Sequence, residues 1–153
     1  MRITDILSPA LVVADLRGST KDEVLRELAE KVAGVYPNIQ AEELLSVLWE
    51  REHGGTTAIG DGIAIPHGRL KGVQQIIAAF GRHRDGVDFH SIDGKPTHLI
   101  FLLVLPEESM GLHLKALARV SRLLKDAGVR QRLLVARDSL ELYDIIRQED
   151  EKL

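Results

Sequence analysis

The chain has 153 residues, of which 44% are hydrophobic and 28% are charged, so we expect residues 1–153 to form one globular domain with a buried core. The formal net charge of −3 argues against nucleic acid as the main ligand, because nucleic-acid sites need clustered basic side chains. The absence of cysteine excludes disulfides, thiolate catalysis and cysteine-based zinc sites.

The first third of the chain predicts one strand and two helices. Residues 10–13 are a short apolar run that can form a strand. Thr20 can cap a helix over about residues 20–33, which Gly34 would close. Apolar residues then recur on one face of residues 41–52, which predicts the second helix.

The middle of the chain changes to β periodicity. Short β-prone runs bounded by Gly, Pro or Asp predict strands at 57–59, 63–65, 76–81 and 98–105. The run Leu99–Leu105 is continuously apolar, as expected of a central strand that is covered on both faces. That run is also the longest apolar stretch and is too short to span a bilayer.

Helices return in the last third. Ser109 can cap a helix that continues through Leu124 and ends at Gly128, and further helices are expected at 129–136 and at 140–146, the last opened by Asp138. This order of elements predicts an α/β fold with one sheet between helical layers. The strand spacing leaves the topology open. Because no membrane span or signal peptide is evident, we expect a cytoplasmic protein without membrane insertion.

Common nucleotide and hydrolase motifs are absent. Gly55 and Gly60 have the spacing of a phosphate-binding loop, but Asp61 replaces the required lysine. Ile65 stands where a dinucleotide fingerprint needs its third glycine, and no Gly-x-Ser-x-Gly elbow occurs. The six histidines show no metal-binding spacing. We therefore expect no cofactor, no metal and no use of ATP.

His67 is the main candidate for chemistry, because it lies between Pro66 and Gly68 at the end of an apolar run. Pro66 restricts the backbone, and Gly68 leaves space for a substituent or a partner backbone. An imidazole accepts a phosphoryl group when one ring nitrogen is free and the other holds the proton, usually against a backbone carbonyl. Spacing alone slightly favours a strand-end histidine that only fills a loop.

Four further residues are candidates to bind phosphate. Arg51 offers a planar fork for bidentate contacts, although an Arg-Glu pair at a helix end is commonly only solvated. Thr56 and Thr57 can donate hydroxyls, although threonine before a strand is equally a strand former. His113, in the first turn after Ser109, would lie near the positive end of a helix dipole, although a lone histidine there is more often a boundary residue.

The segment 51–67 resembles the phosphorylation-site signature of the fructose/mannitol-class (type 2) enzyme IIA of the bacterial phosphoenolpyruvate-dependent phosphotransferase system. The match is Arg-Glu followed by Gly-Thr-Thr-Ala-Ile-Gly-x-Gly-Ile-Ala-Ile-Pro-His, and the resemblance covers residues 3–147. It implies a mixed β-sheet flanked by helices on both faces. It also implies that His67 is the phosphoryl acceptor, that Arg51 and His113 bind the phosphate, and that a small HPr-like histidine-phosphocarrier protein is the donor.

Residues 88–94 and 106–108 look more like the nitrogen-regulatory IIA subgroup of this family. That subgroup implies a phosphotransferase relay component with a regulatory output, through phosphorylation-dependent binding to proteins such as sensor kinases or potassium transport components. The alternative is a sugar-specific IIA subunit that passes the phosphoryl group to a separate IIB. A third hypothesis is an interaction module with a vestigial histidine.

Overall fold

The apolar runs in the middle of the chain form a sheet. The computed structural model describes residues 1–108 and 110–153 and has one six-stranded sheet in that part of the chain. Its strands are β1 (Leu7–Val13), β2 (Ala58–Gly60), β3 (Ile63–Ala64), β4 (His67–Arg69), β5 (Ile77–Val87) and β6 (Thr97–Leu105). The helices are η1 (Ile3–Asp5), α1 (Lys21–Val35), α2 (Ala41–His53), α3 (Met110–Lys125), α4 (Ala127–Val135) and α5 (Ser139–Glu151).

The sheet is mixed, and its strands follow the order β1-β5-β6-β3-β2. β5 and β6 are antiparallel, whereas β1 runs parallel to β5 and β3 runs parallel to β6. β4 also pairs with β6 in parallel, so β3 and β4 lie one after the other along the same edge of β6. The apolar run Leu99–Leu105 is fully buried, which confirms it as a central strand.

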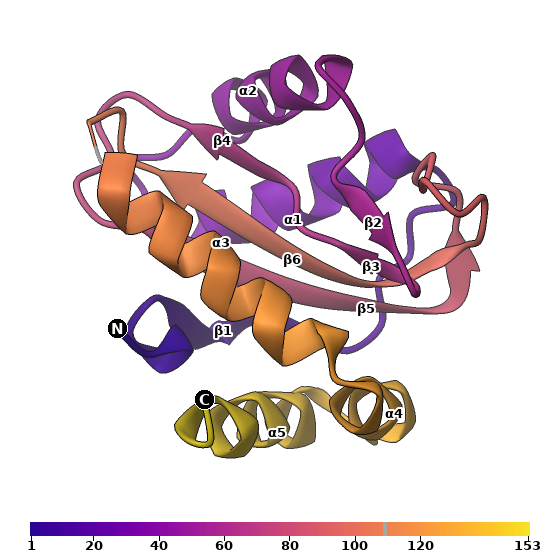
Figure 1. Cartoon of the computed structure of the whole chain (residues 1–153). Coiled ribbons are helices and arrows are strands. Elements are labelled where there is room, and N and C mark those ends of the chain that lie inside the picture. The colour runs from indigo at the N-terminus through magenta and orange to yellow at the C-terminus, as the bar shows by residue number, and fades with distance from the viewer. Residues whose placement is uncertain (109) are drawn as a thin grey trace.

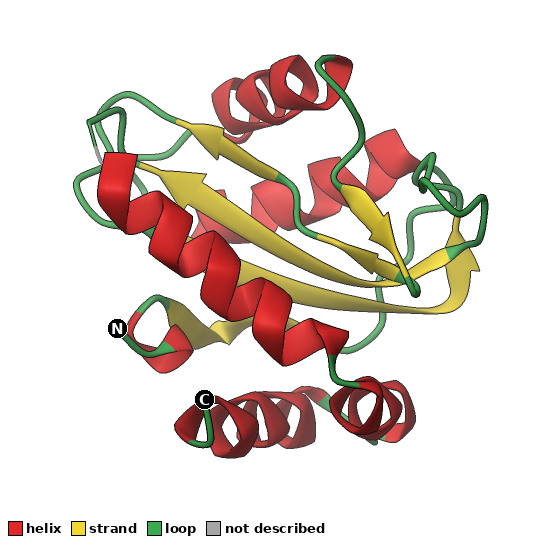
Figure 2. Ribbon diagram, viewed as in Figure 1, coloured by secondary structure: helices red, strands yellow, loops and turns green. Residues whose placement is uncertain are grey.

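Helices cover both faces of the sheet, which confirms the expected fold class (Figures 1 and 2). In Figure 1, α3 crosses in front of the sheet and α1 runs behind it. α2 packs against α1 and β4, and α5 packs against β1. The apolar face of α1 that the sequence predicts is buried at Val24, Leu25, Leu28 and Val32, and burial of each such side chain contributes about 1.5–3 kcal/mol before entropy is subtracted.

Helix starts were predicted better than helix ends. Thr20 accepts the backbone N–H of Glu23, and Asp138 accepts that of Glu141, which confirms both caps. The proposed cap at Ser109 lies outside the described residues.

The glycine stops predicted at Gly34 and Gly128 were wrong. α1 continues through Gly34 to Val35 and ends there because Tyr36 precedes Pro37 and takes an extended backbone. α3 ends at Lys125, before Gly128, because Asp126 is extended and caps α4 instead.

Candidate functional site

Proline and glycine place His67 at a break in the sheet edge. Pro66 has no N–H and separates β3 from β4, but its carbonyl still accepts the N–H of Leu103 at 2.9 Å. His67 therefore begins β4, opposite Leu103 of β6. The tight turn between β2 and β3 has positive φ at Gly60, Asp61 and Gly62, so the glycine-rich segment builds a hairpin before the histidine.

Two neighbours define the tautomer of the His67 ring. Nδ1 lies 2.8 Å from the carbonyl oxygen of Ile65, and this oxygen can only accept a hydrogen bond. On the other side, Nε of Arg51 donates to Nε2 of His67 at 3.3 Å. Assigned from these partners, the ring carries its proton on Nδ1, and Nε2 presents a lone pair toward Arg51.

The surroundings of His67 favour its neutral form. Burial is the main cause that lowers the pKa of His67 below its usual 6.5. The hydrogen bond to Ile65 acts in the opposite direction, and the positive charge of Arg51 lowers the pKa further. The half-buried imidazole is therefore neutral at pH 7, as a nitrogen nucleophile must be.

Arg51 reaches His67 from the last turn of α2. Its side chain is exposed, and its Nη1 donates to the carbonyl of Gly55 at 2.8 Å. The guanidinium is thus held between the loop that follows α2 and the His67 ring. A cation at this end of a helix is also favoured by the helix dipole.

His113 completes a group from three different elements. It lies in the first turns of α3 and lines a pocket of about 440 Å³ together with Arg51 and His67. Arg69 also lines this pocket, and its Nη1 donates to the carbonyl of Glu107 at 3.4 Å. Sequence reasoning missed Arg69, although its position two residues after His67 in β4 places both side chains on the same face.

Thr56 and Thr57 do not line this pocket, and both hydroxyls donate to protein acceptors. Thr56 Oγ1 donates to the carbonyl of Phe89 at 2.9 Å. Thr57 is buried, and its Oγ1 donates to the carboxylate of Glu52. In this arrangement the two threonines hold the loop after α2, rather than facing a phosphate as the sequence reasoning expected.

The space that Gly68 leaves is taken by the backbone of a helix of the same chain. A Cβ atom at Gly68 would lie 3.1 Å from Cγ2 of Val47 and 3.3 Å from the Val47 backbone. The missing side chain therefore gives room to α2 of the same chain, and this close packing brings the end of α2 to β4.

Two kinds of feature are absent from the residues that the structure describes. Among them, no group of three or more histidine, aspartate or glutamate side chains is placed to hold a metal ion. Within the same residues, no helix combines the length and the apolar character that crossing a bilayer requires.

The fold and the pocket define an α/β protein with a neutral histidine that is held in one tautomer and paired with an arginine. Residues 5–149 match the family described as phosphoenolpyruvate-dependent sugar phosphotransferase system, EIIA 2. The chain belongs to this family, as the resemblance of its histidine segment implied.

The chain is similar to proteins named for nitrogen regulation and to a protein named as fructose-specific. The chain is 40% identical to a nitrogen regulatory protein of Bradyrhizobium diazoefficiens, over 95% of both chains. It is 37% identical to the fructose-specific EIIABC component of the phosphotransferase system of Bacillus subtilis, over 98% of this chain but 24% of that longer protein. The solved structure of the nitrogen regulatory protein IIA-Ntr from Neisseria meningitidis is 33% identical and superposes with a TM-score of 0.88, covering 94% of this chain and 98% of that one.

Proposed function

We propose that the protein is a phosphocarrier of the phosphoenolpyruvate-dependent phosphotransferase system and that Nε2 of His67 accepts the phosphoryl group. The observation that carries this proposal is the orientation of the ring, with Nδ1 against the Ile65 carbonyl and Nε2 facing Arg51. Membership of the EIIA 2 family supports the same chemistry. The donor is an HPr-like phosphohistidine protein.

The transfer step needs no proton movement. The lone pair of His67 Nε2 forms the new N–P bond while the N–P bond of the donor phosphohistidine breaks. The electron pair of the broken bond returns to the donor ring, which leaves as a neutral imidazole if its other nitrogen is protonated. The proton on Nδ1 of His67 stays hydrogen-bonded to Ile65 throughout.

Positive charge near His67 would compensate the phosphate. Phosphoryl transfer depends mainly on positioning and on stabilising charge. The guanidinium of Arg51 can leave Nε2 for the phosphate oxygens, which suit its planar fork. His113 and Arg69 line the same pocket, and we expect both to contact a phosphoryl group on His67.

The output of this phosphocarrier is regulatory in our proposal. A relative of matching length is named a nitrogen regulatory protein, and 95% of each chain is covered. Phosphorylation of His67 would then switch binding to regulatory targets, such as sensor kinases or potassium transport components. The similarity to a fructose-specific EIIABC component favours a second candidate, a sugar-specific IIA that passes the phosphoryl group to a separate IIB.

The acceptor site is tested with phosphoenolpyruvate and the donor relay. The parent chain should gain one acid-labile, base-stable phosphoryl group by intact-mass measurement, and His67→Ala should gain none. His90→Ala is the matched control, because His90 is exposed and lies outside the pocket. Modification of His67→Ala to the same extent as the parent would contradict the assignment.

The output is tested with the phosphorylated and unphosphorylated forms of the parent chain. Partners captured from the native cytosol in only one of the two states would support a regulatory switch. Rapid transfer of the phosphoryl group to isolated IIB domains would instead favour the sugar-specific candidate.

A further inference from the structure

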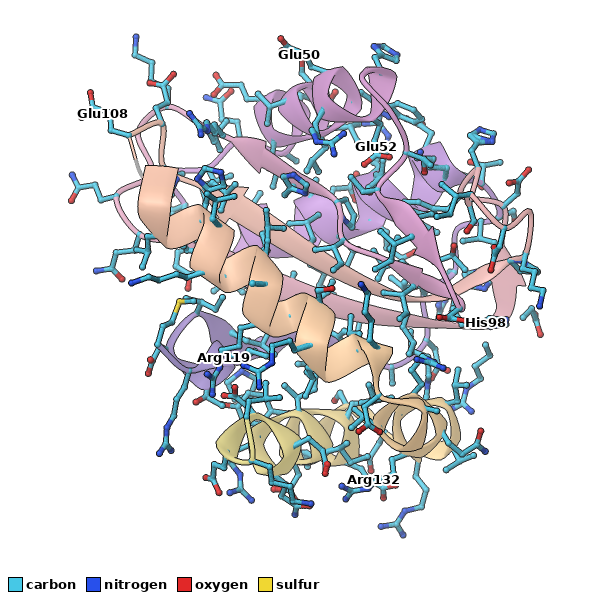
Figure 3. All side chains as sticks on the ribbon, viewed as in Figure 1. Glu50, Glu52, His98, Glu108, Arg119 and Arg132 are labelled. Carbon is cyan, nitrogen blue, oxygen red and sulfur yellow. The ribbon has the colours of Figure 1, made fainter. Side chains whose placement is uncertain are left out.

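A buried ion pair involves Glu52, the residue that follows Arg51 in α2. Nζ of Lys21 lies 2.7 Å from Oε1 of Glu52, and the two side chains are only 6% and 1% exposed. Figure 3 labels Glu52 at the end of α2, beside the segment that leads to β2. Burying two charges is costly unless both are well paired, so the position of this pair calls for an explanation.

Both carboxylate oxygens of Glu52 accept a hydrogen bond from Thr57 in the neighbouring loop. Oε1 accepts the backbone N–H of Thr57 at 3.0 Å, and Oε2 accepts the Thr57 hydroxyl. Lys21 is held in turn, because its Nζ also donates to the carbonyl of Phe89 at 3.3 Å and lies 5.0 Å from the centre of the Phe89 ring. The two carboxylate oxygens of Glu52 therefore hold Thr57 by its backbone N–H and by its hydroxyl.

From Thr57 a chain of hydrogen bonds leads to the His67 ring. The carbonyl of Thr57 accepts the N–H of Ile65 at 3.1 Å. The carbonyl of the same Ile65 accepts the Nδ1 proton of His67 at 2.8 Å. A displacement of Thr57 therefore moves the one acceptor that keeps the proton on Nδ1 and the lone pair on Nε2.

We infer that Glu52, clamped by Lys21, is a positioning residue that holds the nucleophilic nitrogen of His67 in place through Thr57 and Ile65. This inference rests on the proposed role of His67 as phosphoryl acceptor. Glu52 does not line the pocket, and its hydrogen bonds reach the reaction through the tautomer and the orientation of the imidazole. The negative charge of Glu52 also raises the pKa of His67, so the rates are compared at a pH well above 6.5, where the ring is neutral in either case. Arg51 and Glu52 thus act on His67 from its two sides, one on Nε2 and the other by way of Nδ1.

A second buried carboxylate provides a matched control. Asp150 is 1% exposed at its side chain, pairs with Arg119 at 2.7 Å and accepts the backbone N–H of Ile3 at 2.8 Å. Figure 3 places Arg119 close to α5, well apart from Glu52. Asp150→Asn therefore removes a buried charge of the same kind without contact to the His67 loop.

The experiment compares Glu52→Gln with Asp150→Asn and the parent chain. ¹⁵N NMR of the imidazole nitrogens measures which nitrogen of His67 carries the proton, and single-turnover transfer from the phosphorylated donor measures the rate. All rates are taken well below the unfolding temperature of each variant. Glu52→Gln should raise the share of the Nε2–H tautomer and slow the transfer by about ten- to a hundredfold, the range typical when a group that orients a reacting residue is lost.

Asp150→Asn should keep the tautomer and the rate of the parent, even if it lowers the unfolding temperature as much as Glu52→Gln does. Equal tautomer shares and equal rates in Glu52→Gln and the parent would overturn the inference. If Glu52→Gln does not fold, Thr57→Val removes one of the two hydrogen bonds between Glu52 and Thr57 without leaving an unpaired buried charge, while the backbone N–H of Thr57 stays on Oε1. A smaller shift of the tautomer and of the rate in the same direction is then expected, and an unchanged tautomer and rate in that variant overturn the inference.

The two proposals fail in different ways. If the parent chain is not phosphorylated at His67, the proposed function fails, while the NMR comparison still decides whether Glu52 positions the ring. If the parent is phosphorylated and Glu52→Gln matches it in tautomer and rate, only the positioning role fails.

Discussion

Arg51 donates a hydrogen bond from Nε to Nε2 of His67 at 3.3 Å, so the arginine contacts the lone pair that would attack phosphorus. This distance is at the long end for such a bond, and the side chain of Arg51 is exposed. Little free energy is therefore needed to release the guanidinium from the ring. The same contact keeps a positive charge beside the place where a phosphate would arrive.

Replacing Arg51 should affect the reaction more than the fold. Arg51→Ala is expected to slow single-turnover transfer about a hundredfold, because one charged donor to the transferring group is lost. Its free energy of unfolding should change by less than about 0.5 kcal/mol, since the side chain is exposed. Arg84→Ala is the control, because Arg84 is also exposed and pairs with Asp15 away from the pocket. Parent-like transfer by Arg51→Ala would leave Arg51 as a helix-end charge only.

The pH dependence of phosphoryl acceptance should follow the lowered pKa of His67. Since burial is the main cause, the acid limb of the rate profile should have its midpoint below 6.5. Arg51→Ala should move the pKa of His67 upward but keep it below 6.5, because burial remains. An NMR titration of the His67 ring checks both statements. A midpoint at or above 6.5 in the parent chain would contradict this account.

The same pKa shift has a defined sign for stability. Between the lowered pKa in the folded chain and the usual 6.5, the unfolded chain binds more protons at this residue. The contribution of His67 to the free energy of unfolding is therefore complete above pH 6.5 and is lost as the pH falls through that window. The free energies of unfolding of the parent and of His67→Ala, measured by denaturant titration, should therefore approach each other as the pH falls through this range.

His113 should contribute less than Arg51. His113→Ala is expected to slow transfer about tenfold, below the roughly hundredfold effect of removing Arg51, because one ring nitrogen of an imidazole can contact the phosphate, whereas a guanidinium makes bidentate contacts. His53→Ala serves as the control, since His53 is exposed at the end of α2 and lies outside the pocket. Equal rates for the two variants would remove His113 from the site.

The close approach of α2 to β4 can be tested at Gly68. Gly68→Ala would bring a Cβ atom to 3.1 Å from Cγ2 of Val47 and 3.3 Å from its backbone, so Val47 must shift by a few tenths of an ångström, and we expect α2 and Arg51 to shift with it. We expect a loss of about 1–3 kcal/mol in the free energy of unfolding, together with slower transfer. Gly34→Ala is the contrasting control, because Gly34 lies in α1 with open space around it. This substitution should raise the free energy of unfolding by about 0.5–1 kcal/mol. A transfer rate in Gly68→Ala equal to that of the parent would show that this contact does not position Arg51.

The sequence by itself determined the local elements and the family. The apolar run Leu99–Leu105, the caps at Thr20 and Asp138 and the signature over 51–67 all depend on residues a few positions apart, so they can be read from the chain directly. It also placed Arg51 and His113 beside His67, but only through the resemblance, because their separation in the chain says nothing about their separation in space.

Only the tertiary structure decided the chemistry of the histidine. Its tautomer depends on where the Ile65 carbonyl points and on the reach of Arg51 from α2. The first follows from the pairing of β3 and β4 with β6 and from the hydrogen bond between Ile65 and Thr57, and the second follows from the packing of α2 against β4. The burial of Glu52 against Lys21 depends on the packing of α1 beside α2, so the chain alone showed only a charged residue at a helix end. The acceptor of the His67 proton is only two residues away in the chain, but its orientation and the burial of Glu52 against Lys21 are set by segments that are distant in sequence.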